Sequence, residues 1–75
     1  MERYKNLGGD SSVVAYDVGQ GEITVQFSDG WLYLYTTQSA GAANVSEMQR
    51  LASLGRGLNS FIGRVVRKAY ARKWR

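Results

Sequence analysis

The chain has 75 residues, which is enough for one small domain with a single core. It contains no cysteine and no histidine, so disulfides and thiolate or imidazole metal sites cannot stabilise it, and packing must. No apolar run approaches the roughly 20 residues of a membrane span, and the first residues do not resemble a secretory signal. We therefore expect a cytoplasmic protein without a membrane span, metal or other cofactor.

The net charge of +4 is divided unevenly along the chain. Residues 1–49 contain two basic and six acidic side chains, whereas residues 50–75 contain eight basic and no acidic ones. The two parts therefore carry charges of −4 and +8. Such an asymmetry suits a polyanionic partner or an anionic membrane surface. A solvated charged face without any partner would produce the same pattern.

The first residues show no sustained hydrophobic period. They mix charged side chains with Leu7-Gly8-Gly9, a composition that is typical of loose chain ends. We expect residues 1–10 to form a flexible arm outside the core and residues 11–75 to form the single domain.

Three strands are predicted in the first half of the chain. Residues 13–18 are rich in β-branched side chains, and residues 22–27 alternate strictly between apolar and polar ones. Residues 31–36 are apolar on both faces, because Trp31, Tyr33 and Tyr35 alternate with two leucines. The turn before this third strand decides which of its faces is buried.

Two turns are compatible with Ser28-Asp29-Gly30. A two-residue turn at Asp29-Gly30 would direct the leucines inward and expose the aromatic row as a stacking platform for unpaired bases. A three-residue loop with Gly30 in the left-handed region would pair Phe27 with Trp31 and bury the aromatic row.

Two helices are predicted in the second half. Residues 37–43 form a small, polar linker, and Asn44 with Glu47 matches a capping box that opens a helix ending before Gly55. A longer helix follows from Leu58 to Trp74, capped by Asn59. Its apolar stripe is opposed by a basic face; the stripe consists of Leu58, Phe61, Ile62, Val65, Val66 and Ala69. The predicted fold is α+β, a three-stranded antiparallel meander followed by two helices packed on one face (βββαα).

Several short motifs follow one another between residues 11 and 70. They are Ser11-Ser12, Phe27-Ser28-Asp29-Gly30, Tyr33-Leu34-Tyr35, Ala52-Ser53-Leu54-Gly55, Leu58-Asn59, Ile62, Arg64 and Tyr70. Their order resembles that of the KTSC domain, a small module at the C-terminus of some lysyl-tRNA synthetases that also occurs alone in bacterial proteins. The chain departs from the family in lacking the Val-Pro that usually follows the tyrosines. The resemblance favours inward-facing tyrosines and implies a domain that has been suggested to bind RNA.

Catalysis is poorly supported by this sequence. Without histidine or cysteine, acid–base chemistry would depend on six scattered carboxylates that show no pairing or metal-ligand spacing. The glycines match neither phosphate-loop pattern, and no small-molecule substrate is evident. We therefore expect a non-enzymatic binding module.

Nucleic acid, with RNA favoured, is the partner that the composition and the resemblance suggest together. Basic side chains would neutralise phosphates, and tyrosines or Trp31 would stack on bases if they are exposed. The predicted contact residues are Arg56, Arg64, Arg67, Lys68, Arg72, Lys73, Tyr33 and Tyr35. Two alternatives remain open: a protein-interaction or homodimerisation module that uses the aromatic third strand, and attachment of the basic 58–74 helix to a membrane surface.

Overall fold

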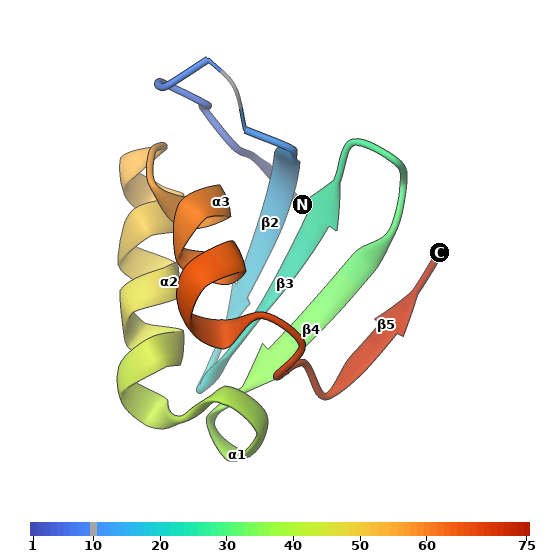
Figure 1. The fold of residues 1–75 in the computed structure, drawn as a ribbon, viewed down its shortest axis with the longest axis vertical. Coiled ribbons are helices and arrows are strands. Elements are labelled where there is room, and N and C mark those ends of the chain that lie inside the picture. The colour runs from blue at the N-terminus through green and yellow to red at the C-terminus, as the bar shows by residue number, and fades with distance from the viewer. Residues whose placement is uncertain (10) are drawn as a thin grey trace.

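The computed structural model describes residues 1–9 and 11–75 and shows one antiparallel sheet with helices on one face (Figure 1). Five strands lie side by side in chain order: β1 (Glu2–Arg3), β2 (Val13–Gly19), β3 (Glu22–Phe27), β4 (Leu32–Thr36) and β5 (Arg72–Trp74). The helical elements are α1 (Thr37–Ala40), α2 (Ala42–Leu54), α3 (Leu58–Phe61) and η1 (Ile62–Val66), a π-helical continuation of α3. The predicted α+β class is confirmed, but the three-stranded meander is wrong, because each end of the chain adds an edge strand.

The N-terminal segment forms one of these edges. Glu2 and Arg3 pair with β2 opposite Tyr16 and Ala15. Tyr4 then enters the core with 3% of its surface exposed, and its hydroxyl accepts a 3.3 Å hydrogen bond from the backbone N–H of Leu58. The expectation that the predicted arm 1–10 stays outside the core is therefore wrong for Tyr4, since a lone buried aromatic residue produces no sequence period. Asp10, the last residue of that predicted arm, lies outside the described residues.

The C-terminal segment forms the other edge, and the predicted helix from Leu58 to Trp74 is wrong beyond Val66. The backbone N–H of Arg67 donates to the carbonyl of Ile62 at 2.6 Å, a five-residue step that widens the last turn. The chain then reverses, and Ala71 donates to the carbonyl of Leu34 at 2.7 Å before β5 pairs with β4. Without β5, the edge of β4 would present unpaired backbone N–H and C=O groups. A strand at the tail can hydrogen-bond to these groups, whereas a helix cannot.

The wide turn also changes which side chains of the predicted stripe are buried. Leu58, Ile62 and Val66, four residues apart, are buried, but Val65 is 50% exposed. The basic side chains of this segment therefore share the surface with an exposed valine.

Of the predicted helix caps, only the C-terminal cap of α2 is observed. Gly55 adopts the left-handed conformation expected of a C-cap, with φ at 88°, and its N–H donates to the carbonyl of Leu51. Asn44 lies within the helix, where its amide donates to the carbonyl of Ala40. A capping box forms instead between Thr36 and Ser39, at the start of α1, in the segment predicted as a linker. Asn59 does not cap α3, which follows Gly57.

The β3–β4 connection is the three-residue loop. Phe27 N–H donates to the carbonyl of Trp31 at 2.9 Å, and Gly30 has φ at 92°. The pairing then continues with Val25 opposite Tyr33 and Ile23 opposite Tyr35, so both tyrosines point to the helix-covered face. The core between sheet and helices consists of Tyr4, Val13, Ile23, Val25, Tyr35, Val45, Met48, Ala52, Leu58, Ile62 and Val66.

None of the helices formed by residues 1–9 and 11–75 is both long and apolar enough to cross a membrane.

Tyr4 offers a direct test of the N-terminal edge. Tyr4→Ala should lower the free energy of unfolding by about 3 kcal/mol, since it empties a buried aromatic site. Tyr4→Phe, which removes only the hydrogen bond to Leu58, should lower it by about 1 kcal/mol. Urea denaturation measures both, and Leu7→Ala serves as the control because Leu7 is 59% exposed. Equal stability of Tyr4→Ala and Leu7→Ala would contradict the packing of this residue.

Candidate nucleic-acid interface

A cleft of about 400 Å³ opens between the β3–β4 hairpin, the end of η1 and the C-terminal tail. Aromatic, basic and polar side chains line it, together with Ile62. The aromatic residues are Phe27, Tyr33, Tyr35 and Tyr70; the basic residues are Arg67, Lys68 and Lys73; the polar ones include Ser12, Ser28, Asp29 and Asn59. This volume lies within the range of pockets that hold small organic groups.

One side of the cleft is formed by the rings of Phe27, Tyr33 and Tyr70, which we call the aromatic wall. Tyr33 lies at its centre. Its ring packs edge-to-face on Phe27 and on Tyr70, each at 5.0 Å between ring centroids. These arrangements match the favoured geometry of aromatic pairs. Phe27 and Tyr33 come from paired strands, but Tyr70 reaches the wall only because the chain turns back after Arg67.

Tyr35 forms the floor of the cleft and has no exposed surface. Its hydroxyl donates to the backbone carbonyl of Arg67 at 3.1 Å. Burial, reinforced by the neighbouring Tyr33 and Tyr70, raises the pKa of Tyr35 well above its ordinary value of 10.0. Tyr35 therefore cannot stack on a ligand and instead fixes the chain reversal at Arg67.

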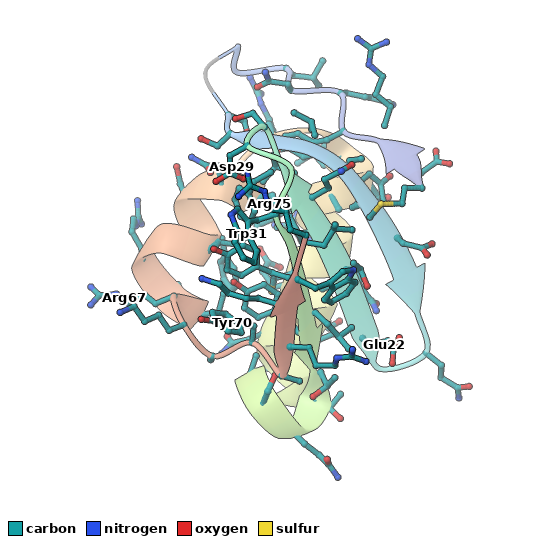
Figure 2. The ribbon with its side chains drawn as sticks, turned by 90° about the vertical axis from the view of Figure 1, so that its right-hand side faces the viewer. Glu22, Asp29, Trp31, Arg67, Tyr70 and Arg75 are labelled. Atoms are coloured by element: carbon teal, nitrogen blue, oxygen red, sulfur yellow. The ribbon has the colours of Figure 1, made fainter. Side chains whose placement is uncertain are left out.

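Arg67 has an unusual backbone conformation for a residue with a side chain. Its φ of 45° and ψ of −113° lie outside the favoured regions. Two hydrogen bonds hold it there, because its N–H donates to Ile62 and its carbonyl accepts from Tyr35. The exposed guanidinium extends away from the body of the protein on the side where Tyr70 lies (Figure 2).

Lys73 places its ammonium group over the rings of Trp31, Tyr33 and Tyr70. We call these three rings the lysine cage. The Nζ atom lies 4.9 Å from the ring centroid of Trp31, 5.6 Å from that of Tyr33 and 6.0 Å from that of Tyr70. The guanidinium of Arg75 also lies over Trp31, at 5.3 Å, and Figure 2 shows the two residues together. Cation–π attraction holds the tail against β4.

The cations of the cleft have no acidic partner within 4.0 Å among residues 1–9 and 11–75. The ion pair that these residues do form is Arg50 with Glu47 on the surface of α2, which lowers the pKa of Glu47 through its hydrogen bonds to Arg50. Asp29 lines the cleft, but one of its carboxylate oxygens accepts a 3.1 Å hydrogen bond from the backbone N–H of Trp31. The positive charge of Arg67, Lys68 and Lys73 is therefore available to an anion.

The predicted contact residues separate into two groups. Arg67, Lys68, Lys73, Tyr33 and Tyr35 all line the cleft, although Tyr35 only as its buried floor. The other three lie elsewhere: Arg56 borders a smaller hollow beside Tyr4, exposed Arg64 is on η1, and Arg72 lies over the Trp74 ring on the opposite face of the sheet from Lys73.

Sequence reasoning missed the roles of Phe27 and Tyr70 in the cleft. The predicted helix through residue 74 separates Tyr70 from the strands, whereas the observed reversal at Arg67 brings it onto Tyr33. The only available signal was its place among the family-like motifs.

No family model matches the chain, and no significantly similar curated protein or solved structure was found. The resemblance to the KTSC domain therefore stays a prediction from short motifs.

Tyr35 should make the stability of the protein depend on pH above its ordinary pKa of 10.0. Because the folded state keeps this phenol protonated, its contribution is complete below pH 10 and decreases as the pH rises further, by up to about 1.4 kcal/mol per pH unit. Tyr35→Phe should cost about 1 kcal/mol at pH 8 and show a smaller decrease between pH 8 and pH 11. Urea denaturation at both pH values measures this; parallel losses in the two proteins would show that Tyr35 is not the group responsible.

Proposed function

We propose that the protein is a non-enzymatic module that binds single-stranded nucleic acid, with RNA preferred, at this cleft. The observation that supports it most is that basic and aromatic side chains line the same cleft. Arg67, Lys68 and Lys73, which have no acidic partner within 4.0 Å among the described residues, border the rings of Phe27, Tyr33 and Tyr70. Single-strand binding proteins combine these two features, since cations follow the phosphates and aromatic rings stack on bases.

In this proposal one unpaired base enters the cleft and stacks on the aromatic wall. Lys73 covers part of these rings in the free protein, so the base would displace its ammonium group toward the adjoining phosphate. Arg67 and Lys68 are exposed at the rim and would contact the neighbouring phosphates. Binding would then replace the cation–π contact of Lys73 by a base stacked on the rings and by a charge-assisted contact of Lys73 with the phosphate.

The polar part of the lining supports RNA over DNA. Ser12, Ser28 and Asn59 can each donate and accept hydrogen bonds, and Asp29 can accept them. A ribose 2′-hydroxyl is both a donor and an acceptor, and it is the group that distinguishes RNA at a binding site.

Protein docking through the aromatic side chains of the 31–36 segment is less favoured. Such docking needs exposed rings, but Tyr35 is completely buried and Tyr33 faces the helices between Phe27 and Tyr70. The opposite face of β4 carries Leu32 and Leu34, and both are half-buried.

Binding to single-stranded RNA should weaken with salt in proportion to the phosphates contacted. Three cleft cations predict a log–log slope of about −2, since single strands contribute about −0.7 per phosphate. Lys68→Ala should reduce the magnitude of this slope by about 0.7, whereas Arg64→Ala, on the same segment but outside the cleft, should leave it close to that of the parent protein. Fluorescence anisotropy with a labelled oligonucleotide measures the slopes. Absence of binding even at low salt would refute the proposed function.

The aromatic wall should contribute to RNA affinity independently of the basic side chains. Tyr70→Ala should weaken RNA binding by roughly 5- to 150-fold, the equivalent of one lost stacking contact of about 1–3 kcal/mol. Tyr70→Phe retains the ring and should bind nearly as the parent protein does. Circular dichroism verifies that both variants are folded, and equal affinities of the two variants would exclude stacking on Tyr70.

A further inference from the structure

The β5 strand is a short element held at the edge of the sheet. All three of its residues are exposed, and within residues 1–9 and 11–75 it pairs only with β4, with Leu32 opposite Trp74, Tyr33 opposite Lys73 and Leu34 opposite Arg72. A strand of this length without buried side chains is among the first parts of a domain to open locally. Its opening would expose the backbone edge of β4 and the empty lysine cage.

The exposed site would be specific for one kind of segment. The edge of β4 accepts an extended chain, and the cage of Trp31, Tyr33 and Tyr70 accepts a lysine facing Tyr33. The structure shows the Arg72–Trp74 sequence seated in this way. The same tail from a second copy of the chain fits the same edge by identity of sequence.

The hinge that leads into β5 is strained. Arg67 has φ at 45° although it is not a glycine, and such a conformation persists only when its surroundings impose it. Here the hydrogen bonds to Ile62 and from Tyr35 impose it. Short, strained hinge loops favour exchange of the element that they carry.

We propose that two copies of this protein exchange their C-terminal strands, so that β5 of each copy pairs with β4 of the other. The exchanged dimer retains the β4–β5 ladder and the contacts of Lys73 with Trp31 and Tyr33, whereas Tyr70, which lies in the extended hinge, leaves Tyr33 of its own chain. It also allows Arg67 to relax into an extended conformation, which breaks the hydrogen bonds of its N–H with Ile62 and of its carbonyl with Tyr35. The backbone strain released at the two hinges then offsets part of the entropy that is lost when two chains associate, which is the physical basis of domain swapping.

The length of the hinge restricts the geometry of this dimer. Residues 67–71 can span at most about 17 Å when extended, which is less than the smallest 22 Å extent of the molecule. The two copies must therefore meet at their β4 edges, related by a twofold axis. Each copy would also receive Lys73 from its neighbour, so that both proposed RNA clefts would be built from two chains.

Engineered disulfides distinguish a tail held within the chain from a tail that has been exchanged. The chain has no cysteine, and Leu34 and Arg72 lie opposite each other, at a spacing that a disulfide can bridge. Leu34→Cys and Arg72→Cys proteins are mixed, unfolded in urea, refolded together and oxidised. Exchange predicts a covalent species of twice the chain mass in the mixture. The control pair, Asp17→Cys with Arg72→Cys, should not form it, because Asp17 lies two strands from β4.

A tail that stays in its own chain gives a different result. The double variant Leu34→Cys/Arg72→Cys should oxidise whether the tail is exchanged or not. If it oxidises only within single chains while the mixture of single variants yields no covalent dimer, the tail stays in its own chain and the proposal fails.

A second measurement tests the hinge without relying on cysteine chemistry. Arg67→Gly relieves the strain in the closed monomer and should reduce the dimer fraction measured by light scattering at least about fivefold. Arg67→Ala removes the same charge but keeps the strain, so its dimer fraction should match that of the parent protein. Equal dimer fractions in the glycine and alanine variants would overturn the hinge mechanism. Neither experiment involves RNA, so failure here is independent of the proposed function.

Discussion

The hydrogen-bonded pairing of Phe27 with Trp31 is the constraint on which the rest of this structure depends. It fixes the register of β4, and a shift by one residue would move every side chain of that strand to the other face. In the observed register Tyr33 and Tyr35 point toward the helices, where one lines the cleft and the other forms its floor. The alternative turn would have produced an aromatic surface on the open face and no cleft of this composition.

The hydrogen bond between Tyr35 and Arg67 links the register of β4 to the position of the C-terminal segment. A buried phenol must find a hydrogen-bond partner, and the carbonyl of Arg67 satisfies it at 3.1 Å. The same carbonyl belongs to the residue where the helical segment stops and the tail turns toward the sheet edge. Strand register, chain reversal and the position of Tyr70 thus form one connected arrangement.

The cleft combines residues that are distant in the sequence. Hairpin residues near position 30 supply one side, and residues 67–73 supply the other. In the described part of the chain the cleft cations have no acidic partner within 4.0 Å, although Asp29 lines the same cleft. The absence of an internal ion pair at these cations supports the proposed anionic ligand.

The sequence by itself determined the elements with local signals: the alternation of 22–27, the buried stripe of α2 and its glycine C-cap at Gly55. It also showed that the second half carries the positive charge. Only the tertiary structure decided the two edge strands and the end of the long helix. Glu2–Arg3 and Arg72–Trp74 are strands because neighbouring backbones offer hydrogen bonds, and no local periodicity records a partner that is distant in the chain.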